Sequence, residues 1–117
     1  MSQSIDILSV VIPSGANSIA FACPSDGRTS LKAIDTPVSF EGTTLTFQAG
    51  YDPAGPGKDL YDGGSLYSIA SGASRYIPVS KPDLFLGAKY LKIVSNVAGV
   101  PSNVAAARTL VLTFTSE

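Results

Sequence analysis

The sequence predicts an all-β protein, an antiparallel β-sandwich of about eight or nine short strands. Two observations carry this prediction. The apolar segments are short and end at glycine or proline, of which the chain has 11 and 8 spread along its length. No stretch of twelve residues keeps a helical apolar stripe without Gly or Pro inside it. A jelly roll is the first choice of topology, and an immunoglobulin-like sandwich is second because the Cys…Trp…Cys signature is absent.

The first half of the chain contains the clearest strand. In residues 43–49 the side chains of Leu45, Phe47 and Ala49 alternate with Thr44, Thr46 and Gln48. A period of two indicates one buried and one solvated face. Turns are predicted at 13–17, 24–27 and 41–42, where Gly, Pro, Asn and Asp gather. Strands are therefore expected over 5–12, 19–23, 31–34, an edge piece at 37–40, and 43–49.

In the second half, Gly63 and Gly64 predict a hairpin between short strands at 59–62 and 65–70. Pro78 places the next strand, 75–79, at a sheet edge or a strand end. A helical or 3₁₀ turn is expected at 81–86, since Pro82 suits its first position. Further strands are expected at 89–95 and 108–115, and loops at 51–58 and 96–106.

Length and composition restrict the class of protein. The 117 residues suit a single domain, 1–117, with short arms at 1–4 and 116–117. A net charge of −1 argues against a nucleic-acid partner. No apolar run is long enough for a membrane span, and the first twelve residues lack the basic start of a signal peptide. We therefore expect a protein made in the cytoplasm and not secreted through a signal peptide.

The sequence contains few of the residue combinations that catalytic sites use. The chain has no His, so His-based catalysis and His–metal sites are excluded, and serine has no imidazole base. The single cysteine, Cys23, lies in an apolar run and is expected to be a small buried side chain. Asp52, Asp59 and Asp62 bracket a Gly/Pro loop, but their spacing fits no known calcium loop. We expect no catalytic residues, no cofactor and no metal, and no enzyme.

Binding is harder to exclude. Tyr51, Tyr61 and Arg75 lie in or beside the middle loops, where the loops of a jelly roll can form a shallow sugar site. The competing interpretation is ordinary strand tyrosines with their hydroxyls at the rim. These three residues are the candidate contacts for a surface glycan or a protein partner.

The middle and end of the chain carry a series of sequence blocks in a fixed order. The blocks are Thr44-Leu-Thr-Phe-Gln-Ala49, Asp59-Leu-Tyr-Asp62, Arg75-Tyr-Ile-Pro-Val79, Phe85-Leu-Gly-Ala-Lys-Tyr-Leu-Lys-Ile-Val-Ser95 and Ala107-Arg-Thr-Leu-Val-Leu112. They resemble a group of small structural proteins encoded among the head and tail genes of tailed bacteriophages, over about residues 43–115. A shorter segment, Ala88-Lys-Tyr-Leu-Lys-Ile93, is similar to the penultimate-strand motif of galactose-binding-like jelly rolls.

The resemblance implies a virion structural protein, foremost a head decoration or cement protein on the capsid surface. It would bind and stabilise the lattice of the major capsid protein, or other virion proteins, as a dimer or trimer. The two termini and the loop at 96–106 are the candidate contact arms. The alternatives are a tail, baseplate or head-fibre module, or a carbohydrate-binding jelly-roll module for attachment to a host surface. A charged content of only 15% favours an assembly component, because such a surface is covered at little desolvation cost.

Overall fold

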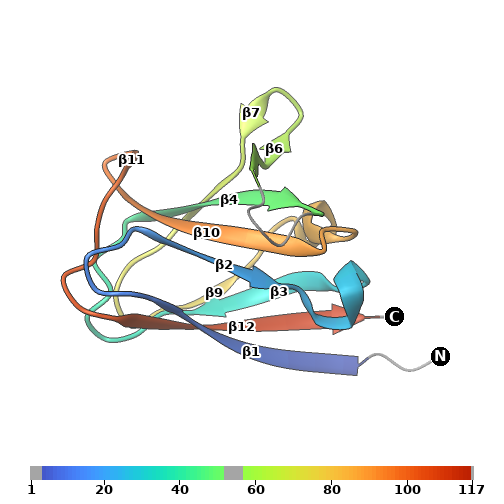
Figure 1. Ribbon diagram of the computed structural model, residues 1–117, viewed down its shortest axis with the longest axis horizontal. Helices are drawn as coiled ribbons and strands as arrows, with labels where there is room; N and C mark the ends of the chain where they lie inside the picture. The colour runs from blue at the N-terminus through green and yellow to red at the C-terminus, as the bar shows by residue number, and fades with distance from the viewer. Residues whose placement is uncertain (1–3, 52–56, 117) are drawn as a thin grey trace.

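Two antiparallel sheets pack face to face in the computed structural model, which describes residues 4–51 and 57–116 (Figure 1). Sheet A has the strand order β1-β12-β3-β9. Every neighbouring pair in it is antiparallel, and β1 and β12 align over nine residues, from Ser4 opposite Ser116 to Ile12 opposite Arg108. The strands of sheet A are β1 (Ser4–Ile12), β12 (Arg108–Ser116), β3 (Ser30–Asp35) and β9 (Tyr76–Pro78).

Sheet B is built around β10 and β4, which pair over seven residues. On the side away from β4, β10 pairs with β2 and, farther along, with β11. On the side away from β10, β4 pairs with β5 and with β8. A separate hairpin, β6–β7, follows β5 (Figure 1). These strands are β10 (Tyr90–Val97), β4 (Thr44–Gly50), β2 (Ser18–Ala22), β11 (Val100–Pro101), β5 (Lys58–Asp59), β8 (Ser68–Ala70), β6 (Tyr61–Asp62) and β7 (Ser65–Leu66).

The core lies between the sheets. It consists of the alternate side chains of each strand that face inward. Leu110, Leu112 and Phe114 of β12 are fully buried, and so are Leu45 and Phe47 of β4. The prediction of an all-β, antiparallel sandwich is thus confirmed. Eight strands of the described chain have three or more residues; β5, β6, β7 and β11 have two each. The predicted one-turn element is the 3₁₀ turn η2 (Pro82–Phe85), with a second, η1, at Pro24–Gly27.

Three expectations about local structure are wrong. Residues 37–40 form a turn, closed by the Phe40 amide donating to the Pro37 carbonyl at 3.2 Å, and the buried Phe40 side chain fixes the segment without a strand ladder. Residues 96–106 are not all loop, since β10 continues to Val97 and turns into β11. Ser4 and Ser116 are not arms, because they pair with each other at the ends of β1 and β12. The rest of the expected arms, 1–3 and 117, lies outside the described residues.

One ion pair joins the segment before β4 to the first residue of β12. The Glu41 carboxylate accepts bonds from Arg108 Nε at 2.8 Å, from Arg108 Nη2 at 3.1 Å and from the Ala105 amide at 3.0 Å. The Arg108 hydrogen bond is the main reason that the pKa of Glu41 falls from 4.5 to about 2. The lowered pKa means that the folded state favours the ionised carboxylate.

This ion pair makes the free energy of unfolding depend on pH in the acidic range. Its contribution is complete above pH 4.5, the ordinary pKa of the carboxyl, and is lost as the pH falls towards 2. We expect Glu41→Gln to be less stable than the wild type at pH 6, with the gap narrowing steadily below pH 4.5. Denaturant titrations at pH 6, 4 and 3 measure this. Asp83→Asn, at an exposed carboxylate in η2, is the control, and a constant gap for Glu41→Gln across the series would contradict the assignment.

Candidate functional site

The structure does not bring the three candidate binding residues together. Tyr51 follows the last residue of β4, Gly50, which pairs with Tyr90. Arg75 lies at the other end of the sandwich, where its amide donates to Thr36 Oγ1 and Thr36 Oγ1 donates to the Gly72 carbonyl. The neighbouring Ser71 amide donates to the Thr43 carbonyl, just before β4 begins. Tyr51 and Arg75 are therefore separated by the length of β4, roughly 20 Å for its seven residues.

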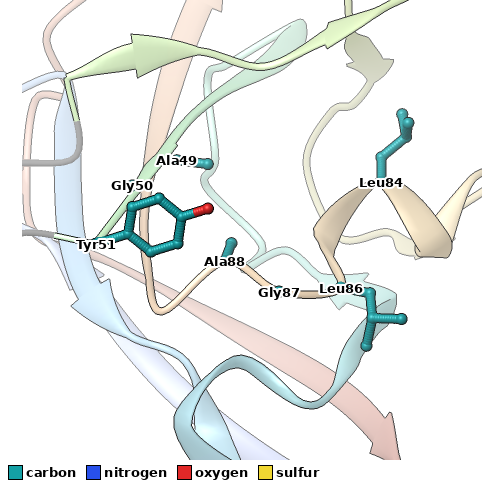
Figure 2. A pocket seen from close by; sticks show the side chains of 7 residues that line it. All are labelled: Ala49, Gly50, Tyr51, Leu84, Leu86, Gly87 and Ala88. Atoms are coloured by element: carbon teal, nitrogen blue, oxygen red, sulfur yellow. The ribbon is translucent and has the colours of Figure 1, made fainter.

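Tyr51 lines a shallow pocket of about 240 Å³ at the end of β4 (Figure 2). Its ring lies beside Ala49 and Ala88, and Leu84 and Leu86 lie farther along the η2 segment (Figure 2). No charged side chain is among the described residues that line it. The pocket offers a small apolar surface and one phenol hydroxyl, which is too little for specific recognition of a polar ligand.

A larger groove of about 380 Å³ lies on the outer face of sheet B, and we call it the sheet B groove. Outward side chains of β4 and β10 contribute to it, from strands whose opposite faces form the core. The β6–β7 hairpin contributes Leu66, and the β10–β11 hairpin contributes Gly99 and Pro101. The full lining is Thr44, Thr46, Gln48, Asp59, Leu66, Ser68, Val94, Asn96, Gly99 and Pro101.

Hydrogen bonds hold the polar side chains of the sheet B groove in place. Gln48 Nε2 donates to Asp59 Oδ1 at 3.1 Å, which links β4 to β5. Asn96 Nδ2 donates to Thr46 Oγ1 at 3.1 Å and to the Val94 carbonyl at 3.1 Å, and the Asn96 side chain is buried. These amides and hydroxyls therefore form an ordered array without a ligand.

Tyr61 is the one sequence candidate that lies next to the sheet B groove. It pairs directly with Leu66 across the β6–β7 hairpin, and directly opposed residues of an antiparallel pair project from the same face. Leu66 lines the groove, and Tyr61 lies outside the lining, beside Leu66 on the same face of the hairpin. The ring is 53% exposed and so available for contact.

The outer side of β1 is a second functional candidate, which sequence reasoning missed. β1 is an edge strand of sheet A, and among its outward side chains Ile5 and Ile7 are 67% and 62% exposed. Ser9 and Val11 continue the same face, and Asp6 is the only charged residue of the strand. We call this strand with its outward side chains the β1 edge. The alternation of Ile5, Ile7 and Val11 was the available signal, but only the sheet order shows that no strand of the described chain covers it.

Cys23 has the environment expected of an inert thiol. It is 7% exposed, and burial raises its pKa to about 12. Because the thiolate is the reactive form, we expect the native protein to react with a disulfide-exchange reagent at pH 8 at least a hundredfold more slowly than the denatured protein. Absorbance of the released chromophore measures both rates. Comparable rates would mean that the thiol is accessible and the assignment is wrong.

The acidic residues considered for calcium, Asp52, Asp59 and Asp62, do not come together within the described residues. Asp59 is bonded to Gln48 and Asp62 pairs with Lys81, while Asp52 lies outside the described residues. Residues 4–51 and 57–116 contain no group of three His, Cys, Asp or Glu side chains placed to hold a metal ion.

Comparison of the chain with protein-family models, with curated proteins and with solved structures gives no match. In the described part of the chain, no helix has the length and apolar character to cross a membrane.

Proposed function

We propose that this chain is a non-enzymatic structural protein of a tailed-phage virion, a head decoration or cement protein that binds and stabilises the lattice of the major capsid protein. The observation that carries the proposal is the β1 edge, a nine-residue edge strand with an apolar outer side. The sequence blocks that resemble small phage structural proteins point to the same class of protein.

The β1 edge has only one of the usual protections of an edge strand, the inward-facing charge of Asp6. Soluble proteins guard long edges with Lys, Pro, bulges or inward charges, because exposed backbone groups pair with other chains. β1 has no Lys, no Pro and no register shift against β12, and carries only Asp6. Such a strand is suited to adding to a strand of a neighbouring chain in an assembly.

The outer face of sheet A extends this contact surface. Next to the β1 edge, β12 presents Thr109, Val111, Thr113 and Thr115, which pair with the outward residues of β1. Uncharged, β-branched side chains lose little hydration when a partner covers them, and their few rotamers limit the entropy lost. This face therefore suits close packing against a capsid protein.

We infer further that the sandwich is a jelly roll. Successive strands of three or more residues alternate between the sheets, with β1, β3, β9 and β12 in sheet A and β2, β4, β8 and β10 in sheet B. Only β4 and β8 follow each other within one sheet. Eight strands in two sheets, arranged as two Greek keys, define the jelly roll, which is used in viral capsid domains among others. Topology alone assigns no function, so this inference supports the proposal only together with the β1 edge.

The test is the stoichiometry of the protein in purified virions of the phage that carries the gene, by quantitative mass spectrometry against the major capsid protein. A ratio within a few-fold of one to one is expected. A few to a few dozen copies per particle would overturn the cement assignment in favour of a tail, baseplate or head-fibre part. Complete absence from virions would overturn the structural proposal altogether.

A further inference from the structure

We propose that the sheet B groove is a binding site for an uncharged glycan, with Gln48, Thr46 and Tyr61 as its main contacts. This site lies on sheet B, whereas the proposed assembly surface lies on sheet A. The glycan site therefore goes beyond the structural role and is independent of it. A virion component with both surfaces would be anchored through one sheet and would present the other sheet to a sugar.

The chemistry of the lining selects a neutral, hydroxyl-rich ligand. Five of the lining side chains are uncharged hydrogen-bonding groups, on Thr44, Thr46, Gln48, Ser68 and Asn96. The one charged side chain, Asp59, already accepts a bond from Gln48. No Lys or Arg is among the described lining residues, so the lining itself supplies no counter-charge to an anionic ligand such as a phosphate or a nucleic acid. Lys92, opposite Gln48 on β10, lies outside the lining.

The hydrogen-bonding groups are oriented for ligand hydroxyls. Thr46 Oγ1 accepts the Asn96 amide, which leaves the Thr46 hydroxyl proton to be donated to a ligand oxygen. Asp59 Oδ1 accepts one N–H of the Gln48 side-chain amide, which fixes the orientation of the second N–H and of the amide oxygen. A sugar hydroxyl both donates and accepts; the amide groups can do both in return, and the Asp59 carboxylate can accept. Because these bonds exist without ligand, little side-chain entropy is lost on binding.

The walls of the groove supply the apolar contact that a pyranose ring needs. Leu66 and Val94 present aliphatic surface inside it, and Pro101 closes the β11 side. Tyr61 shares the face of Leu66 on the hairpin and is placed to pack its ring against the C–H face of a sugar. The volume of about 380 Å³ falls in the range of small-molecule sites and suits one or two sugar residues.

A peptide strand is the weaker alternative. Peptides that add to a sheet need a free edge, and in the groove both long strands are paired on both sides. β4 lies between β10 and β5 or β8, and β10 lies between β4 and β2 or β11. A ligand must therefore bind through side chains alone, which favours the hydroxyl-rich class.

The experiment uses the full chain and an array of neutral oligosaccharides containing glucose, galactose, mannose and N-acetylglucosamine, with sialylated and sulfated glycans alongside. The best neutral ligand is then titrated by calorimetry. We expect saturable binding to at least one neutral glycan, weakened about tenfold by Tyr61→Ala and by Gln48→Ala. Thr46→Val, which removes one hydroxyl and keeps the shape, is expected to weaken it severalfold.

The chain offers matched controls on sheet A. Tyr76→Ala removes another exposed tyrosine, 67% exposed against 53% for Tyr61, from a short strand on the other sheet. Thr113→Val makes the same change as Thr46→Val on the outer face of β12. Both controls are expected to bind like the wild type. No binding to neutral glycans, binding only to charged ones, or equal losses in the test and control variants would each overturn the proposal.

Discussion

Phe47→Ala is expected to lower the free energy of unfolding by about 3–5 kcal/mol. The Phe47 side chain is fully buried, and its ring lies 5.0 Å from that of Phe85 in an edge-to-face arrangement. It also lies 6.3 Å from the ring of Tyr67. Through these contacts Phe47 connects β4 of sheet B to η2 and to the segment between β7 and β8.

The size of the effect follows from packing. Removing the ring loses its transfer free energy and leaves a cavity beside Phe85 and Tyr67, whose rings also pack edge to face at 5.9 Å. Since small domains unfold with about 5–15 kcal/mol, this loss consumes much of the total. Urea titration followed by circular dichroism measures it. Tyr76→Ala, at an exposed ring, is expected to change stability by less than about 0.5 kcal/mol, and a similar small change for Phe47→Ala would contradict the core assignment.

The position of Phe47 could be predicted from the sequence, and so could most of the core. Strict alternation at 43–49 and 108–115 marked Phe47 and Phe114 as inward, and both are fully buried. Alternation is local and follows from strand geometry alone, so it needs no knowledge of partners. The Gly63-Gly64 hairpin was equally local and is confirmed by the pairing of Asp62 with Ser65.

The β10–β11 hairpin was missed because its turn carries an unusual residue. Val97 pairs with Val100, so the turn consists of Ala98 and Gly99, at φ 55° and 78°. A two-residue turn of this kind needs positive φ at both positions, for which Asn-Gly and Gly-Gly are the usual signals. An alanine in that region is uncommon, and the sequence therefore read as loop.

The candidate site depended on contacts that the sequence does not encode locally. Tyr51 and Arg75 looked like neighbours of Tyr61 because all three fall within 25 positions of one another, yet β4 separates the first two. The outward positions Thr44, Thr46 and Gln48 were identified, but their function as a groove floor requires two hairpins to flank them. That arrangement depends on the pairing of β4 with β10, which are about 45 residues apart in sequence.

The chain is expected to form a dimer in solution through the β1 edge, and Ile5→Lys combined with Ile7→Lys is expected to make it a monomer. Two copies of β1 related by a two-fold axis can pair antiparallel with Leu8 at the centre. All nine residues then pair, from Ser4 opposite Ile12 of the second copy. Because a two-fold interface closes on itself, this contact gives a dimer and not a trimer.

The side chains agree with this register. Ile5 comes opposite Val11 and Ile7 opposite Ser9, so the exposed apolar residues of both copies form one continuous strip. Asp6 comes opposite Val10, and like charges are not opposed. Four lysines on the strip would repel one another across the seam, whereas each alone is tolerated on an exposed position of the monomer.

Sedimentation equilibrium separates the two states. The control is Val38→Lys combined with Leu86→Lys, which adds the same charge at exposed apolar residues away from β1 and is expected to stay dimeric. A wild-type monomer at high micromolar concentration, or a lysine variant that remains dimeric, would show that β1 does not join two copies.

Cysteine cross-linking then tests the register itself. In a Cys23→Ser background, a mixture of Ile7→Cys and Ser9→Cys chains should form a disulfide readily, since opposed residues have Cα atoms about 4.5–5.5 Å apart. A mixture of Ile5→Cys and Ser9→Cys places the thiols two positions out of register, beyond easy bridging, and should react much more slowly. Preference for the second mixture would mean pairing about Ile7 instead of Leu8, which would leave Val11 and Ile12 without partners in the second copy of β1 and shorten the shared ladder.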